Sequence, residues 1–314
     1  MDHFWVPDTR SFLEGLSQSP QDSEKPNCMS ISDLLHTGVI LLALSAASMA
    51  LFFSILFFRE LSFTYFFVIF LLTYAVYGID RLASLEEDKF SHPERTRFLR
   101  QHRGLFALSV TFTFLISVFL AAISNLVFVT LIPVAPIVVI LYSGDLSQRL
   151  LGTRGPNVKQ YFIIKDVAIA SGWALLLFTT SVFLSQPVVS EQWIFLIPLL
   201  MKLCVMAVAY DFKDLSSDRR GGVRSLPIVL GERPTKLLLH FLNFVATIII
   251  LVLIFFGVLP FLSVVFVPAF IYQFIVIQRV RQDAPDWVYF VLCDLEQFFW
   301  LLFLGIGVLI IGYP

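Results

Sequence analysis

Three aspartates recur at helical spacing at the end of an apolar segment of the chain. Asp211, Asp214 and Asp218 stand at positions i, i+3 and i+7, so a helix would carry them on one face. The cations that follow them are Arg219, Arg220 and Arg224. Carboxylates are hard oxygen ligands suited to Mg²⁺, and guanidinium groups suit phosphate oxygens. Carboxylates at the end of an apolar segment are costly and usually functional. This stretch therefore predicts a Mg²⁺–diphosphate site at a membrane surface.

A second acidic loop follows another apolar segment, near residue 80. Its polar positions recur at i, i+4, i+7 and i+8, which predicts a shared helical face: Asp80, Ser84, Glu87 and Asp88. Neighbouring like charges on a helix repel by roughly a few tenths of a kcal/mol per pair, and a divalent cation can offset that repulsion. Two such faces turned toward each other can hold Mg²⁺ ions that bridge a diphosphate. The simpler alternative is a pair of solvated loops, which the closely following arginines of the second loop disfavour.

Composition places these loops in a membrane protein. The chain has 314 residues, of which 58% are hydrophobic and only 14% charged, whereas a soluble domain carries roughly 25% charged residues. Apolar runs repeat along the chain, which predicts an all-α, polytopic membrane helical bundle of about nine transmembrane helices. The predicted spans are 34–58, 61–79, 105–123, 125–142, 161–184, 193–210, 235–256, 259–278 and 290–312. No basic patch with interleaved aromatic residues indicates nucleic acid as a partner.

The distribution of charge predicts the orientation of the chain. Residues 1–32 are polar and read as a disordered tail, and residues 33–314 read as a single transmembrane domain. With nine helices, nearly all cations fall on one face, and the opposite face holds only Arg59. The positive-inside rule then puts the tail and the acidic loops in the cytosol, with the C-terminus on the other side of the lipid bilayer.

The second loop resembles the second aspartate-rich motif of the UbiA superfamily of intramembrane prenyltransferases. That motif is DxxxD, followed by a basic residue and a Ser/Thr-Leu-Pro stretch that runs to Leu-Gly. The matching residues are Asp214, Asp218, Arg224, Ser225-Leu226-Pro227 and Leu230-Gly231. The resemblance covers most of the chain from about residue 33 onward, and it implies that the helices surround a central apolar chamber.

The first loop is similar to the first motif of that family, NxxxDxxxD. Asp80 stands at the Asn, Ser84 at the first Asp and Asp88 at the second. Ser84 thus replaces a carboxylate and Asp80 an amide, which moves one charge by a helical turn, and Glu87 can compensate. Further elements that resemble the family are an arginine downstream of the first motif, Arg95, and a Lys-Asn pair before the fifth helix, here Lys165-Asp166.

The resemblance implies a reaction and a set of roles. Mg²⁺ and cations would hold an allylic prenyl diphosphate, its C–O bond would ionise, and a lipophilic acceptor would capture the allylic cation as pyrophosphate is released. Catalytic roles are implied for Asp80, Asp88, Asp214 and Asp218. Together with the spacing, it implies that the metal contacts come from Asp80, Ser84, Glu87, Asp88, Asp211, Asp214 and Asp218. Diphosphate contacts are expected from Arg81, Arg95, Lys165 and Arg224.

Three alternatives stay open at this point. A UbiA-type membrane terpene cyclase would ionise the same substrate and cyclise it without an acceptor. A transporter or scaffold is disfavoured because the carboxylates gather at one membrane face and not at the midplane. A CDP-alcohol phosphotransferase is disfavoured because that family packs its aspartates into one short motif. Lys202, inside the predicted sixth helix, is expected to face the bundle interior and to reach a phosphate or pair structurally.

Overall fold

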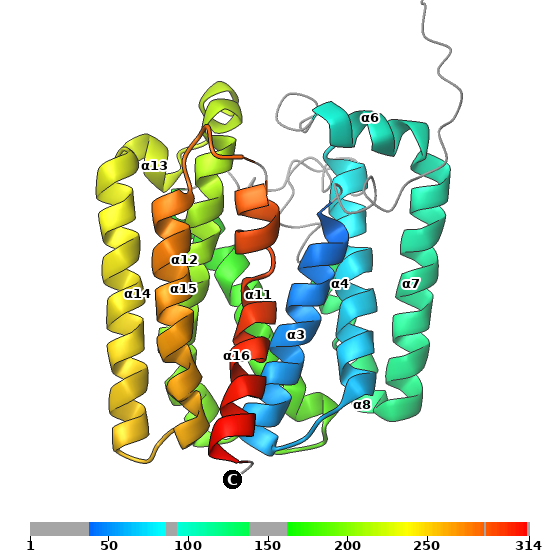
Figure 1. The fold of residues 1–314 in the computed structure, drawn as a ribbon. Coiled ribbons are helices and arrows are strands. Elements are labelled where there is room, and N and C mark those ends of the chain that lie inside the picture. The colour runs from blue at the N-terminus through cyan, green and yellow to red at the C-terminus, as the bar shows by residue number, and fades with distance from the viewer. Residues whose placement is uncertain (1–37, 86–92, 138–161, 286, 313–314) are drawn as a thin grey trace, which may run out of the picture.

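The computed structural model describes residues 38–85, 93–137, 162–285 and 287–312, and these residues form helices without any strand (Figure 1). The first half holds α3 (Val39–Phe58), α4 (Phe63–Ala83), α6 (Pro93–Gln101), α7 (Arg103–Ser124) and α8 (Leu126–Val129). The second half holds α11 (Ile164–Phe183), α12 (Ser190–Gly221), α13 (Leu226–Val229), α14 (Glu232–Phe255), η2 (Phe261–Val265), α15 (Phe266–Arg279), η3 (Val288–Cys293) and α16 (Glu296–Ile311). The predicted tail, residues 1–32, lies outside the described residues.

The helices confirm the predicted polytopic all-α bundle. Seven described helical segments are long and apolar enough to cross a membrane, and two shorter apolar ones, Leu126–Ile137 and Glu296–Ile311, correspond to the predicted fourth and ninth spans. The count of nine is therefore approximate. The predicted span 290–312 is not one continuous α-helix, because η3 ends at Cys293 and α16 begins at Glu296. Polar residues interrupt the apolar pattern at this break, namely Asp294 and Glu296.

Short connections at one end of the bundle make successive helices antiparallel. Ser62 begins α4, and its hydroxyl accepts a hydrogen bond from the Tyr65 amide at 3.3 Å. Asn125 follows α7 directly; its Oδ1 accepts from the amides of Val127 and Phe128, which begins α8. Its Nδ2 donates to the carbonyl of Val182 at 2.6 Å and so ties this turn to α11. As a result, the last turns of α4 and α12 and the first turn of α11 lie at the opposite end, the upper end of Figure 1.

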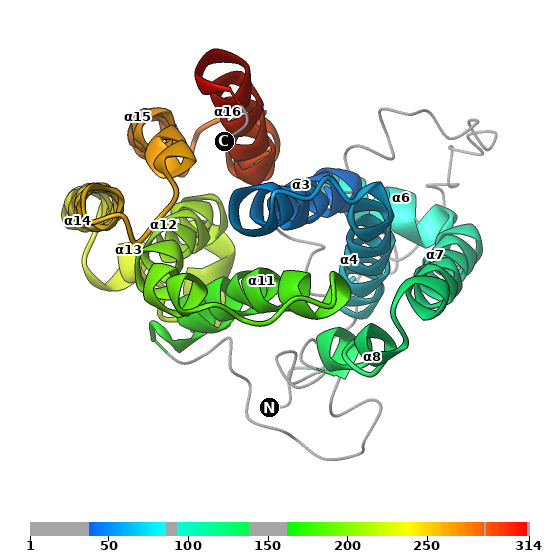
Figure 2. The same cartoon turned by 90° about the horizontal axis from the view of Figure 1, so that it is seen from below.

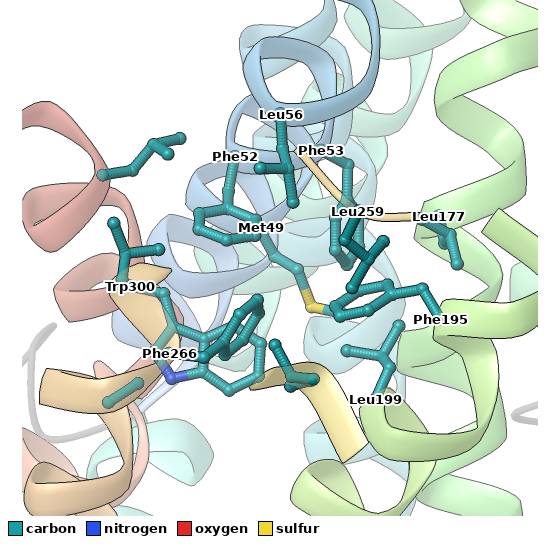
Figure 3. Packing of buried hydrophobic residues seen from close by; sticks show 14 of the residues in the cluster. Met49, Phe52, Phe53, Leu56, Leu177, Phe195, Leu199, Leu259, Phe266 and Trp300 are labelled. Atoms are coloured by element: carbon teal, nitrogen blue, oxygen red, sulfur yellow. The ribbon is translucent and has the colours of Figure 1, made fainter. Parts of the chain in front are cut away.

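Seen from below, α3 lies beside α4, α11 and α16 (Figure 2). Away from the acidic end, aromatic side chains from α3, α12, α15 and α16 pack together (Figure 3). The Phe266 ring lies 5.5 Å from Phe52, 5.4 Å from Phe195 and 5.2 Å from Trp300, between ring centroids. Each such pair contributes about 0.5–1.5 kcal/mol beyond its buried area. Phe195 precedes Asp211 by 16 positions on α12 (195 to 211), so the two are separated by about 24 Å along the helix. This part of the predicted apolar interior is closely packed.

Candidate functional site

A buried lysine joins the first turn of α11 to the acidic face of α12. Lys165 Nζ donates to Asp211 Oδ1 at 2.7 Å and also lies 3.4 Å from Asp218 Oδ2. Because α12 continues as one helix to Gly221, these two aspartates lie on the same face, two turns apart. The predicted extension of the sixth helix through the acidic loop is confirmed, and the contact adds a cation from α11 to that face.

Asp166, the neighbour of this lysine, brings a further carboxylate to the same place. Its side chain is buried, and neither of its oxygens has a hydrogen-bond partner within the described part of the chain. The charges of Asp211 and Asp218 both act on it. The Oδ2 atom of Asp211 is also buried without a described partner. Buried carboxylates need a cation or hydrogen-bond donors, and oxygen donors of this kind suit Mg²⁺. The residues present therefore fit a divalent cation.

Asp214 links this cluster to the first acidic loop. Its carboxylate interacts electrostatically with Asp218, Lys213 and Lys165, and also with Arg81 at the end of α4. Arg81 lies 3.8 Å from the carboxylate of its neighbour Asp80, measured from Nη1 to Oδ2. The last turns of α4 and α12 thus bring opposite charges toward each other at one end of the bundle.

The break between η3 and α16 contributes a fourth element to this end. The carboxyl group of Asp294 is buried, and the charges of Arg81, Lys213 and Arg95 all act on it. Lys213 Nζ also lies 3.9 Å from the centre of the Phe290 ring, at cation–π distance. The spacing of the two acidic loops points to neither Lys213 nor Asp294 as a site residue. The fold brings both residues to the acidic end. The one sign of this in the sequence is that each is a charged residue close to an apolar segment, where charges are often functional.

The first acidic loop differs from the prediction of one helical face over residues 80–88. The helix α4 ends at Ala83, and Ser84 is its cap. Both the hydroxyl and the amide of Ser84 donate to the carbonyl of Asp80, at 2.8 and 2.9 Å. Serine commonly competes with helix continuation through such local bonds. Of the predicted shared face, the structure describes Asp80 and Ser84, and Glu87 and Asp88 lie outside the described residues.

The remaining predicted contacts divide into two groups. Arg95 on α6 is buried, with 6% of its surface exposed, and its charge acts on Asp294. Arg224 is exposed and forms no ion pair with a described residue. Within the described ranges, no group of three acidic, histidine or cysteine side chains is arranged closely enough to hold a metal on its own.

Lys202 belongs to a separate polar cluster. Its Nζ donates to Asn243 Oδ1 at 2.9 Å and to Gln273 Oε1 at 3.1 Å, which joins α12 to α14 and α15. No carboxylate of the described residues lies within ion-pair distance of it. Lys202 precedes Asp211 by nine positions (202 to 211), which is about 13.5 Å along the helix. Of the two predicted roles, the structure therefore favours structural pairing, with amides as the partners.

The fold and this charged end define an integral membrane protein with a carboxylate- and cation-rich site where α4, α11 and α12 end or begin. The sequence model of the UbiA prenyltransferase family matches residues 34–303. The chain belongs to this family, which confirms the resemblance seen in its motifs.

Solved structures of the family share the fold. A UbiA homologue from Archaeoglobus fulgidus bound to GPP and Mg²⁺ is 13% identical with a TM-score of 0.62; the match covers 88% of this chain and 100% of that one. An apo UbiA homologue from Aeropyrum pernix K1 is 15% identical with a TM-score of 0.60, covering 90% and 99%. A structure reported for digeranylgeranylglyceryl phosphate synthase is 15% identical with a TM-score of 0.53, covering 90% and 99%. No curated protein sequence matches the chain.

Proposed function

We propose that this protein transfers a prenyl group from an allylic prenyl diphosphate to a lipophilic acceptor within the membrane, with Mg²⁺ as cofactor and pyrophosphate as the second product. The observation that carries the proposal is the cluster of buried carboxylates around Lys165, at the end of a closely packed apolar bundle. Membership of the UbiA prenyltransferase family supports the substrate class. The A. fulgidus relatives, with the same fold, are bound to GPP or DMAPP together with Mg²⁺.

The residues of the chain divide the work of binding. Asp211, Asp214 and Asp218 would hold the metal from α12, and Asp80 would do so from α4. Ser84, Glu87 and Asp88 remain candidate ligands from the first loop. When bound, Mg²⁺ supplies positive charge to the departing diphosphate. Lys165, Arg81 and Arg95 would bind and orient diphosphate oxygens as negative charge develops on them, which is the stabilisation that preorganised cations provide. Arg224 stays a candidate for the same role.

The bond changes follow from this arrangement. The allylic C–O bond breaks, and its electron pair leaves on pyrophosphate. A nucleophilic carbon or oxygen of the acceptor supplies the electron pair of the new bond and then loses a proton. The apolar, aromatic-rich bundle below the charged end would shield the allylic cation from water and stabilise it through ring faces.

The reaction can be tested with the purified full-length protein. It is incubated with Mg²⁺ and allylic prenyl diphosphates of increasing length, with and without lipophilic acceptors, and pyrophosphate and organic products are measured. We expect pyrophosphate release that requires both Mg²⁺ and one acceptor, with a matching prenylated product. Controls are chelation of Mg²⁺ and the Asp218→Asn variant. No release with any pair of substrates would contradict the proposal, and a cyclic hydrocarbon or terpene alcohol formed without acceptor would replace it with cyclisation.

We also propose that the charged end faces the cytosol, as the positive-inside rule predicts. Arg224 is exposed at this end, and Glu60 is exposed in the turn at the opposite end. A membrane-impermeant thiol reagent should label an Arg224→Cys variant only in inside-out membranes and a Glu60→Cys variant only in intact cells. The reverse pattern would invert the assigned orientation.

A further inference from the structure

Lys165 is the shared counter-charge of three carboxylates at the junction of α11 and α12. It contacts Asp211 and Asp218 directly, and Asp166 interacts electrostatically with each of these aspartates. One ammonium group can neutralise only one of three carboxylates. Uncompensated buried charge is strongly destabilising, so this junction favours a further cation.

Asp166 marks where that cation would lie. Only 2% of its surface is exposed, and both of its oxygens lack a hydrogen-bond partner among the described residues. The Oδ2 atom of Asp211 is also buried and also lacks a hydrogen-bond partner among the described residues. These three carboxylate oxygens belong to two helices that the Lys165–Asp211 ion pair joins, and none of them has a described hydrogen-bond partner.

We propose that Asp166 is a ligand of the divalent cation that Asp211 and Asp218 hold, so that α11 contributes a carboxylate to a metal site otherwise formed by α12. The inference deepens the proposed function and rests on it for the role of the metal. Mg²⁺ usually takes one or two protein carboxylates and completes its shell with water and phosphate oxygens. The described carboxylates do not form a closed three-residue metal cluster, so the proposal requires one of these three to reach the metal through a bound water.

The first motif gives this assignment a consequence for the chain as a whole. Ser84 offers a neutral hydroxyl that already donates to the carbonyl of Asp80. With Asp166 as a ligand, the part of the site near α12 would carry more negative charge than the part near the first loop. The metal nearest α12 should then bind more tightly than any metal at the first loop.

The test measures metal binding and does not depend on turnover. Mn²⁺, which prefers the same oxygen ligands, is titrated into the full-length protein and followed by electron paramagnetic resonance. We expect Asp166→Asn to weaken Mn²⁺ binding by about tenfold or more. Asp211→Asn is the positive control. Glu296→Gln is the matched control, because Glu296 is equally buried but lies in the Lys202 cluster, and we expect wild-type affinity for it. If wild-type protein needs phosphate oxygens to complete the site, the titration is repeated with inorganic pyrophosphate.

A second measurement separates ligation from a purely structural role. Thermal unfolding is compared in chelator and in Mg²⁺. In chelator, Asp166→Asn should melt above the wild type, because one repelling charge is gone, and its gain in Tm on adding Mg²⁺ should be smaller. The proposal would be overturned if Asp166→Asn bound Mn²⁺ as tightly as the wild type while Asp211→Asn lost affinity. It would also be overturned if the wild type bound no Mn²⁺ with or without pyrophosphate.

The two proposals fail in distinguishable ways. Mn²⁺ binding that depends on Asp166, in a protein that releases no pyrophosphate from any prenyl diphosphate, would refute the proposed function and leave this metal ligand standing. Prenyl transfer by a protein whose metal affinity does not depend on Asp166 would support the proposed function and refute Asp166 as a metal ligand.

Discussion

Lys165 Nζ lies 2.7 Å from Asp211 Oδ1, and this ion pair joins the start of α11 to the acidic face of α12. Both side chains are about nine-tenths buried, with 10% and 9% of their surfaces exposed. Removing one partner of such a pair leaves the other charge without compensation, which costs about 3–5 kcal/mol. The pair therefore determines both the stability of this end of the bundle and the position of its carboxylates.

We predict that Lys165→Met lowers the Tm by several degrees in chelator and that Mg²⁺ restores part of the loss, because the metal replaces the missing positive charge. Lys165→Arg keeps the charge and should melt close to the wild type, which makes it the control. Thermal unfolding of the three proteins, with and without Mg²⁺, checks the prediction. A Lys165→Met protein that melts like the wild type in chelator would show that the pair contributes little.

The second prediction concerns the two aspartates of the second motif. Asp214→Asn and Asp218→Asn should each lower the rate of prenyl transfer by at least about tenfold, because each removes a charge that holds the metal and, through it, the leaving diphosphate. Asp283→Asn is the control, since Asp283 is an exposed residue paired with Arg281 at 3.1 Å. Steady-state rates at saturating Mg²⁺ measure the effect. Wild-type rates in both motif variants would contradict the site assignment.

The α12 half of this site could be predicted from the sequence because local periodicity carries it. The i, i+3, i+7 spacing of Asp211, Asp214 and Asp218 is a property of one helix, and α12 continues through all three. The contact of Lys165 with that face could not be predicted by spacing, because it joins positions 46 residues apart through helix packing. The same holds for Asp166, whose burial depends on how closely α11 approaches α12.

The first loop shows the opposite limit. Its spacing was compatible with a helix over residues 80–88, but α4 ends at Ala83. Periodicity records which face a residue would occupy if the helix continued. It does not record that the hydroxyl of Ser84 competes for the carbonyl of Asp80 and caps the helix. The predicted ninth span is likewise interrupted at residues 294–295, because a long apolar run outweighs the two polar residues, Asp294 and Glu296, that mark the break.

A third prediction follows from the close approach of α4 and α7. A Cβ atom added at Gly78 would collide with Cγ2 of Val110, and small residues allow membrane helices to approach in this way. Gly78→Ala should therefore destabilise the protein by about 1–3 kcal/mol. Because Gly78 lies two positions before Asp80, the displacement should also lower prenyl transfer.

The partner of Gly78 provides the check. Adding Val110→Ala to Gly78→Ala removes the colliding methyl group and should recover part of the lost Tm. Gly305→Ala is the matched control, since Gly305 is also helical but has no atom within 4 Å of an added Cβ. A Gly78→Ala protein as stable as Gly305→Ala would mean that α4 and α7 are not in tight contact at this level.

The last prediction concerns the polar cluster around Lys202, which is fully buried between α12, α14 and α15. Lys202→Met leaves Asn243 Oδ1 and Gln273 Oε1 without their donor, and each unsatisfied buried group costs about 1–3 kcal/mol. Glu296 on α16 interacts electrostatically with Lys202, and its Oε2 has no hydrogen-bond partner among the described residues. Losing the lysine therefore also removes the cation that favours the charged form of the buried Glu296 carboxyl group.

Two variants measured together isolate this coupling. The glutamine side chain of Glu296→Gln has nearly the same shape as glutamate. In the wild type, the Trp300 indole donates to Glu296 Oε1 at 3.1 Å, and the glutamine Oε1 can accept the same hydrogen bond. We expect Lys202→Met alone to lower the Tm by several degrees. The double variant Lys202→Met/Glu296→Gln should melt higher than Lys202→Met, because removal of the carboxylate charge relieves the imbalance. If the changes in Tm of the two single variants simply add in the double variant, Lys202 and Glu296 contribute independently to stability. The buried lysine would then be stabilised by its amide hydrogen bonds alone.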